Sequence, residues 1–447
     1  MRNKKEALLK RMIGVVAVLL AMALGLVAVV LAVQNSSIAA SADISQTTTQ
    51  SQSTISQGGE NSMDTQSQSQ VQPESQPVSA QLTDEYRAMW ISYLEWATVD
   101  CTSEATFRAG IQKIFDNCLN MGINTVITQV RPFGDALYKS TVYPWSHVLT
   151  GTQGQDPGYD PLAIMVEEAH SRQLKIEAWV NPYRVRLNSN NPVGGLADNN
   201  PAELHPDWTE EVNDGIYYNP AFPDVQQLVI DGVLEIVKNY EVDGVHLDDY
   251  FYPTTEESFD ATEYALMGNG KSLADWRREN VNTLIRNLYA AIKQVRPGCT
   301  LGISPQGNND NNYNSQYSDV SLWLSTPGYA DYIMPQIYWG FDYLTQSGRE
   351  DYQFAKLAQD WAYYPRAASV KLYVGLGAYR IGVGDGGYSD QTEWSNGENL
   401  KKMIEQCRNV EGISGFALYR YNNLFDNAEY PQLAQQEAAA LTNLLKP

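Results

Sequence analysis

From Tyr86 onward, segments with the pattern of β-strands alternate with segments with the pattern of α-helices, and this alternation limits the possible folds more than any other feature. Eight short apolar runs have the strand pattern: Arg87–Leu94, Thr125–Arg131, Lys175–Asn181, Gly244–Tyr250, Thr300–Pro305, Tyr332–Tyr338, Lys371–Ala378 and Gly415–Arg420. The main helical patterns are Ala105–Asn120, Pro161–Arg172, Asp224–Tyr240, Leu273–Val295, Gly397–Arg408 and Tyr430–Leu445. Eight strands alternating with helices predict an α/β fold, a closed parallel (β/α)8 or TIM barrel. An open doubly wound sheet is the alternative, but no glycine fingerprint follows the first strand.

The segments that connect a strand to the next helix are longer than those that connect a helix to the next strand. Long segments follow four of the predicted strands: Pro182–Pro223, Phe251–Lys271, Gln306–Ala330 and Tyr379–Asn396. The connections from a helix to the next strand are short, as at 121–124 and 296–299. Long βα loops on one face mark the functional face of such a barrel, so we expect the site at the carboxyl ends of the strands.

The first 82 residues differ in composition from the rest of the chain. Residues 1–11 are basic, and residues 12–33 form an uninterrupted apolar run. About 20 apolar residues cross a bilayer, and positive flanking residues stay in the cytoplasm. We therefore expect a cytoplasmic N-terminus at 1–11, a single-pass transmembrane signal anchor at 12–33, a disordered Ser/Gln/Thr-rich linker at 34–82 and an extracytoplasmic catalytic domain at 83–447. Cleavage after Ala42 would instead release a secreted domain.

The composition excludes some partners and several chemistries. The formal net charge of −21 argues against nucleic acid as a partner. The chain has 28 Tyr and 10 Trp against 10 Phe, and these amphipathic rings suit sugar faces as well as core packing. None of the four His has the His-Glu-x-x-His spacing of a metal site, and no Gly-x-Ser-x-Gly elbow occurs. We expect no metal and no cofactor, and the oligomeric state stays open.

The fourth predicted strand ends in two adjacent acids, Asp248 and Asp249, within Glu241–Pro253. Side chains alternate along a strand, so Gly244, His246 and Asp248 share one face. Val245 and Leu247, on the other face, suit the helix layer. This parity predicts that Asp248 faces the mouth of the barrel, and the two acids are our candidate catalytic residues.

Polar and aromatic residues at other strand tips are candidate substrate-binding residues. They are Arg131, Glu177, Trp179, Asn181, His246, Tyr250, Gln336, Tyr338, Trp339 and Arg420. Glu177 lies deeper in its strand, and a buried ion pair with an arginine is the alternative interpretation of it. Because the sequence offers carboxylates but neither a metal site nor a nucleophilic serine, it favours acid/base catalysis. Cleavage of a glycosidic bond needs a proton donor and a second group that stabilises or captures the oxocarbenium-like centre.

Five stretches of the chain, taken in order, resemble the glycosyl-hydrolase-like family 10, a group of bacterial envelope barrels. They are Arg87-Ala-Met-Trp-Ile-Ser, the segment 122–132 that ends Gln129-Val-Arg-Pro, Lys175-Ile-Glu-Ala-Trp-Val-Asn-Pro-Tyr-Arg184, Asp243–Pro253 and Met334-Pro-Gln-Ile-Tyr-Trp339. The resemblance covers about residues 86–430. It implies a β/α barrel and glycoside hydrolysis, and family members with assigned activity act on peptidoglycan glycan strands, notably those stripped of peptides.

The strand-four tip is also similar to that of N-acetylhexosaminide hydrolases with an Asp-Asp pair. That likeness implies that Asp248 orients the substrate's 2-acetamido group and that Asp249 is the general acid/base. The other mechanism uses Asp248 as a direct nucleophile, with Asp249 or Glu177 as the acid. Tyr250 occupies the position at which chitinase-like barrels carry a catalytic Glu, so an acid of that type is absent.

The sequence therefore predicts a membrane-tethered glycosidase that cleaves an aminosugar-containing cell-wall polysaccharide, with peptidoglycan strands as the expected substrate. Two alternatives stay open: a glycan-binding barrel without turnover, and a hydrolase of another exported polysaccharide.

Overall fold

The computed structural model describes residues 85–190, 192 and 194–446. The predicted signal anchor at 12–33 and linker at 34–82 lie outside these residues. Among the described helices, none has both the length and the apolar character that a membrane span needs.

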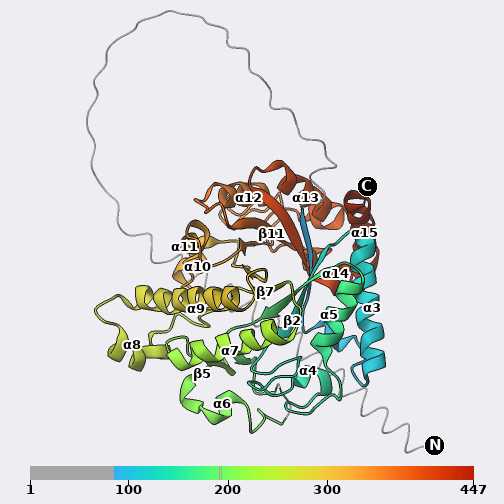
Figure 1. Ribbon diagram of the computed structural model, residues 1–447. Helices are drawn as coiled ribbons and strands as arrows, with labels where there is room; N and C mark the ends of the chain where they lie inside the picture. The colour runs from blue at the N-terminus through green and yellow to red at the C-terminus, as the bar shows by residue number, and fades with distance from the viewer. Residues whose placement is uncertain (1–84, 191, 193, 447) are drawn as a thin grey trace, which may run out of the picture. The chain divides into compact units, whose positions relative to one another are not determined.

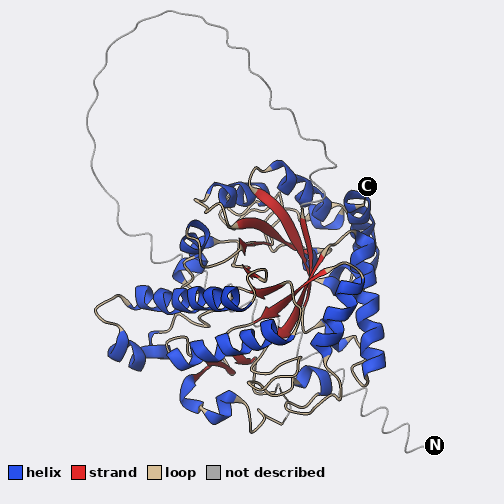
Figure 2. Cartoon of the chain, in the orientation of Figure 1, coloured by secondary structure: helices blue, strands red, loops and turns tan. Residues whose placement is uncertain are grey.

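Nine strands form one closed parallel sheet, in which two short strands share one position (Figures 1 and 2). In chain order they are β1 (Tyr86–Ile91), β2 (Thr125–Arg131), β3 (Lys175–Val180), β7 (Gly244–Leu247), β8 (Thr300–Ile303), β9 (Tyr332–Ile333), β10 (Gln336–Ile337), β11 (Lys371–Gly377) and β12 (Ile413–Tyr419). The last strand pairs with the first, with Tyr86 to Met89 in register with Gly415 to Leu418, and this pairing closes the barrel. The predicted α/β TIM barrel is confirmed.

The sixth barrel strand was expected as one run, but it is split into β9 and β10. Pro335 lies in the gap and has no N–H to donate to a neighbouring strand. Its carbonyl accepts a hydrogen bond from the backbone N–H of Gly375 at 2.9 Å. The break therefore interrupts the strand without opening the barrel.

The helices lie around the outside of the sheet, as Figure 2 shows. The six predicted helices are present as α3 (Glu104–Met121), α5 (Pro161–Ser171), α7 (Pro223–Asn239), α9 (Leu273–Val295), α13 (Asn399–Asn409) and α15 (Pro431–Leu445). Side-chain oxygens of Ser103, Asp160 and Ser272 cap the N-termini of α3, α5 and α9. Helices α11 (Val320–Ser325) and α12 (Phe354–Tyr363) complete the ring and were not predicted.

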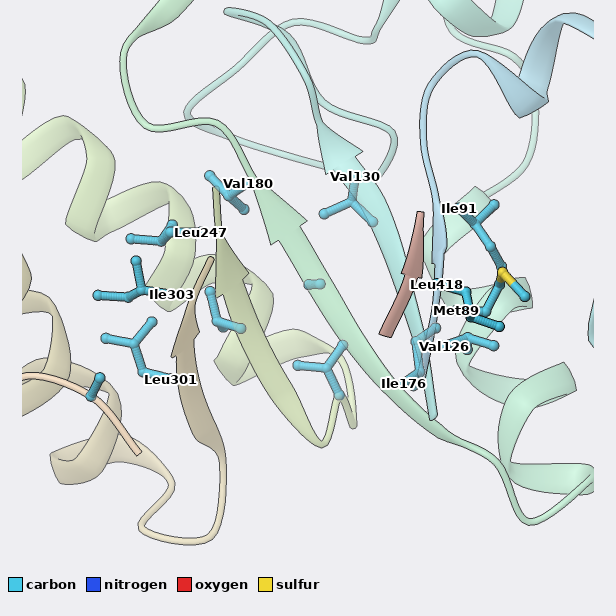
Figure 3. Close-up of a cluster of buried hydrophobic side chains, with 14 of the residues drawn as sticks. Met89, Ile91, Val126, Val130, Ile176, Val180, Leu247, Leu301, Ile303 and Leu418 are labelled. Carbon is cyan, nitrogen blue, oxygen red and sulfur yellow. The ribbon is translucent and has the colours of Figure 1, made fainter. Parts of the chain in front are cut away.

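The alternation of side chains along the strands separates two apolar layers. Outward-facing residues of β1, β2, β3, β7 and β8 pack into the large core between sheet and helices (Figure 3). Inward-facing residues form a smaller cluster inside the barrel, which consists of Ala88, Trp90, Ile127, Trp179, Tyr332, Met334 and Ala417. Val245 and Leu247 belong to the outer core, as the parity of the fourth strand predicted.

The long βα segments contain elements of their own. After β3 the chain forms a small antiparallel sheet of β4 (Arg184–Arg186), β5 (Thr209–Val212) and β6 (Gly215–Tyr218). The short helix α6 (Pro201–Leu204) lies between β4 and β5 in this segment. Other short helices follow β2, β7, β8 and β12: α4 (His147–Thr150), α8 (Ala261–Met267), α10 (Asn309–Asn314) and α14 (Tyr421–Phe425). Arg277 of α9 pairs with Asp260 at 2.6 Å, and both side chains are fully buried. This ion pair fixes the loop that follows the catalytic candidates.

Candidate active site

A pocket with a volume of about 280 Å³ lies at the carboxyl ends of the barrel strands. Its walls are aromatic and its polar groups are few, which is the usual character of a small-ligand or sugar site. The lining residues are Trp90, Trp179, His246, Asp248, Asp249, Tyr250, Ser304, Gln336, Tyr338, Tyr379 and Tyr419. Both predicted catalytic acids are among them.

Asp248 is buried and held by side chains of the neighbouring strand. Its Oδ2 accepts hydrogen bonds from Trp179 Nε1 at 3.2 Å and from Asn181 Nδ2 at 2.5 Å. Burial, and then the charge of Asp249, raise the pKa of Asp248 well above its usual range, while the positive charge of Arg184 opposes the rise. The carboxyl group therefore has a fixed orientation and an environment that favours its protonated form.

Asp249 is also buried, but its partners come from the opposite side of the pocket. Its Oδ1 accepts a hydrogen bond from Gln336 Nε2 at 3.1 Å. Gln336 is positioned in turn by a bond from the same nitrogen to the carbonyl of Ser304 at 2.9 Å. Burial raises the pKa of Asp249 as well. Two adjacent buried acids with separate hydrogen-bond partners resist carrying two negative charges at once, so one of them can hold a proton to donate.

Below the acids, a chain of hydrogen bonds crosses the barrel interior. Trp90 Nε1 donates to His246 Nε2 at 3.2 Å, so the His246 proton lies on Nδ1, 2.8 Å from the Tyr332 hydroxyl. The Tyr332 hydroxyl donates to Glu177 Oε2, and Tyr86 donates to Glu177 Oε1 at 3.0 Å. Burial lowers the pKa of His246 to about 3, so this imidazole is neutral at physiological pH.

Glu177 belongs to this lower layer and is not among the residues that line the pocket. Burial raises its pKa to about 7. Within the described residues its carboxylate has two tyrosine hydroxyls as partners and no arginine, so the alternative of an arginine ion pair is wrong. Because His246 and Tyr332 lie between Glu177 and the pocket, a role as the acid that assists Asp248 is not favoured.

Arg131 was expected to be a substrate-binding residue, but it does not line the pocket. A bulge interrupts the pairing of β2 with β3, so Gln129 lies beside Trp179 and Arg131 lies beside Val180, an outward-facing residue. The extra residue reverses the parity. The Arg131 guanidinium donates to the carbonyl of Asn181 at 2.8 Å and lies 4.3 Å from the centre of the Tyr143 ring.

Three further candidates lie outside the pocket lining. Asn181 acts through Asp248 and is fully buried. Arg420 binds the buried carboxylate of Glu95, which anchors the segment after β1. Trp339 packs against Tyr352, with ring centres 5.1 Å apart.

Five residues at or beside the pocket were not among the candidate site residues. Trp90, Ser304, Tyr379 and Tyr419 line it, and Arg184 lies 5.7 Å from the ring centre of Tyr250. The parity rule that found His246 also applies to Trp90, which alternates with outward-facing Met89 and Ile91. Tyr379 and Arg184 stand beyond strand ends, in segments whose course the strand pattern does not determine.

A closed parallel barrel with a pair of acids in an aromatic pocket at its carboxyl face defines the class of the protein: it is a (β/α)8-barrel glycosidase. The chain belongs to the glycosyl hydrolase-like 10 family, whose model matches residues 85–396.

Curated relatives carry glycosyl hydrolase names. The chain is 36% identical over 372 residues to the glycosyl hydrolase YngK of Bacillus subtilis, which covers 78% of this chain and 70% of YngK. It is 35% identical over 375 residues to the glycosyl hydrolase DigH of Escherichia coli K12, which covers 76% of this chain and 83% of DigH. Among solved structures, the PgaB (BpsB) glycoside hydrolase domain of Bordetella bronchiseptica superposes with a TM-score of 0.50 at 12% identity, over 81% of this chain and 99% of that one. That likeness shows the fold.

The raised pKa values of the two acids predict that they destabilise the folded protein near neutral pH. The unfolded chain releases these protons near the ordinary Asp pKa of about 3.9, whereas the folded protein retains them to higher pH. The two acids therefore leave the free energy of unfolding unreduced below about pH 3.9, and they lower it as the pH rises toward their raised pKa values. We expect Asp249→Asn to remove the part of the loss that comes from Asp249 and to increase the free energy of unfolding at pH 7 by about 1–2 kcal/mol.

Urea unfolding at pH 4 and pH 7 measures this effect, provided that both proteins unfold reversibly in one step. The gain should be confined to pH 7. An equal gain at both pH values would show that the substitution acts through packing and not through charge.

Proposed function

We propose that this pocket cleaves glycosidic bonds of an aminosugar-containing cell-wall glycan, peptidoglycan strands that include peptide-free ones, by carboxylate acid/base catalysis. The Asp248–Asp249 pair inside an aromatic pocket carries the proposal. The names of the relatives YngK and DigH support hydrolysis of a glycan. Tyrosine and tryptophan faces suit sugar rings, and a buried acid of raised pKa suits proton donation to a leaving oxygen.

The hydrogen bonds of the two acids favour different roles for them. Asp248 has one oxygen occupied by Trp179 and Asn181, so it is suited to hold and polarise a substrate group in a fixed position. Asp249 accepts a hydrogen bond from Gln336 at 3.1 Å and lines the pocket, and it is suited to give and take a proton.

In the substrate-assisted route, the acetamido oxygen attacks the anomeric carbon while Asp249 protonates the departing oxygen. Water then opens the cyclic intermediate and returns a proton to Asp249. In the other route, the Asp248 carboxylate forms the bond to the anomeric carbon as the glycosidic bond breaks, and the departing oxygen takes a proton from Asp249. Water then displaces Asp248 from the anomeric carbon and returns a proton to Asp249.

We also propose that the chain is a single-pass protein of the cell membrane with its barrel on the outer side. The basic residues at 1–11 and the apolar run at 12–33 support this location. Protease should degrade the barrel when it is added to intact cells whose outer envelope layers have been removed. Full-length protein in the membrane fraction supports the anchor, whereas a shortened protein in the medium supports cleavage after Ala42.

A comparison of polymers tests the proposed substrate. The purified full-length protein is incubated with peptide-free peptidoglycan strands, with intact peptidoglycan and with neutral and acidic exported polysaccharides, and new reducing ends are counted. Fastest cleavage of peptidoglycan-derived strands supports the proposal. Fastest cleavage of another polymer, or tight binding without new reducing ends, contradicts it.

A further inference from the structure

Arg184 stands beside the pocket at the start of β4, where the chain leaves the barrel after β3. Its guanidinium lies 4.8 Å from the ring centre of Phe133 and 5.7 Å from that of Tyr250, a residue of the pocket wall. Its Nε donates to the carbonyl of Pro132 at 2.9 Å. The centre of the Tyr93 ring lies 5.9 Å away. Three aromatic rings and one backbone carbonyl therefore hold the guanidinium in place.

The two terminal nitrogens of this guanidinium have no protein partner among the described residues. Arg184 forms no ion pair there, and its two terminal nitrogens donate no hydrogen bond to the protein. Its side chain is only partly buried, and its terminal nitrogens are not among the fully buried polar atoms that lack a partner. By contrast, Arg186 on the same strand pairs with Glu211 at 3.7 Å.

A second arginine near the pocket shows what a purely structural role looks like. Arg380 lies 4.6 Å from the ring centre of Tyr379, another residue of the pocket wall. Its Nε donates to the carbonyl of Tyr338 at 3.2 Å, and its Nη1 donates to the carbonyl of Gly384 at 3.3 Å. Arg380 therefore ties two loops together, whereas the fork of Arg184 is free to bind a ligand.

We propose that Arg184 binds a free carboxylate on the substrate and so sets the specificity of the pocket. A guanidinium fixed through Nε presents two parallel N–H donors, the geometry that matches a carboxylate. The inference rests on the proposed function. In a peptidoglycan strand this group is the lactyl carboxylate of the muramic acid residue, which is free only after the stem peptide has been removed.

The stem peptide removes the negative charge that Arg184 would bind. While the peptide is attached, the lactyl carbonyl belongs to a neutral amide, which offers Arg184 no negative charge. A hydrolase of that amide must therefore act before Arg184 can recognise the strand.

The test compares two polymers and three variants of the full-length protein. One polymer is the peptide-free strand, and the other is the same strand with its carboxyl groups reduced to alcohols. The variants are Arg184→Gln, Arg184→Lys and, as the matched control, Arg186→Gln. The kcat/KM is measured for each pair from new reducing ends, and binding is measured for each pair by calorimetry.

We expect the wild-type enzyme to prefer the carboxylate polymer by about 10–100-fold, because charge-assisted bonds in a partly buried site have this strength. Arg184→Gln should slow both reactions, since the positive charge near Asp248 is lost, but should abolish most of the preference. Arg184→Lys should restore part of it, and Arg186→Gln should retain it.

Two results would overturn the inference, and they differ from each other. If wild type and Arg184→Gln show the same ratio of kcat/KM for the two polymers, Arg184 does not read the carboxylate, although the proposed function stands. If the wild-type protein neither cleaves nor binds either polymer, the proposed function fails and the inference fails with it.

Discussion

Asp248→Asn is expected to lower kcat on the preferred glycan by about 10²–10⁴-fold, the range that a positioned carboxyl group contributes to acid/base or covalent catalysis. The amide keeps the shape of the side chain and can still accept hydrogen bonds from Trp179 and Asn181. It cannot ionise, so it can neither polarise an acetamido group nor attack the anomeric carbon. Initial rates of reducing-end formation, with the near-UV circular dichroism of the variant, measure the effect.

Asp243→Asn is the matched control for this prediction. Asp243 precedes the same strand at its opposite end and binds the backbone N–H of Ile176 at 2.9 Å, far from the pocket lining. The control should keep most of its activity. If Asp248→Asn folds and stays within tenfold of the wild-type rate, the assignment of Asp248 as a catalytic residue is wrong.

Gly302→Ala is expected to destabilise the protein by about 3 kcal/mol or more, because the interior of the barrel has no room for the added methyl group. A Cβ atom at Gly302 would lie 1.8 Å from Cζ of Tyr332. The Tyr332 ring cannot withdraw, since its hydroxyl is bonded to His246 and Glu177. Overpacking of this kind typically costs about 1–3 kcal/mol and more where the neighbours are fixed.

Chemical denaturation of the variants measures this loss. Gly298→Ala is the control, because nothing lies within 4 Å of a Cβ atom at that position, four residues earlier. It should change the free energy of unfolding by less than about 0.5 kcal/mol. The double variant Gly302→Ala with Tyr332→Leu should recover part of the loss if the clash is the cause. An equal loss in Gly302→Ala and Gly298→Ala would refute the packing argument.

The barrel follows from local features that a single sequence contains. Strand-like runs with short helix-to-strand connections predicted the eight strand positions and the functional face. The alternation of side chains predicted that His246 and Asp248 face inward and that Leu247 packs under the helices, and the structure places them so. These properties depend on backbone geometry over a few residues.

The failures arise where a local irregularity or a distant contact decides the outcome. One extra residue in β2 turns Arg131 outward. The amino-acid composition of the strand does not predict such a bulge. Glu177 looked like a site residue, but its partners Tyr86 and Tyr332 come from strands 91 and 155 residues away in the chain. Arg184 was missed as a site residue because it lies beyond the end of β3, at the start of β4, where the strand pattern does not determine the course of the chain.

Analysis of the products formed in H₂¹⁸O tests the central claim most directly. The full-length wild-type protein is incubated with peptide-free peptidoglycan strands in labelled water, and the new chain ends are examined by mass spectrometry. We expect one ¹⁸O atom at each new reducing end, and we expect Asp248→Asn to form far less product. Products without the label, or equal amounts of labelled product from wild type and Asp248→Asn, would contradict that claim.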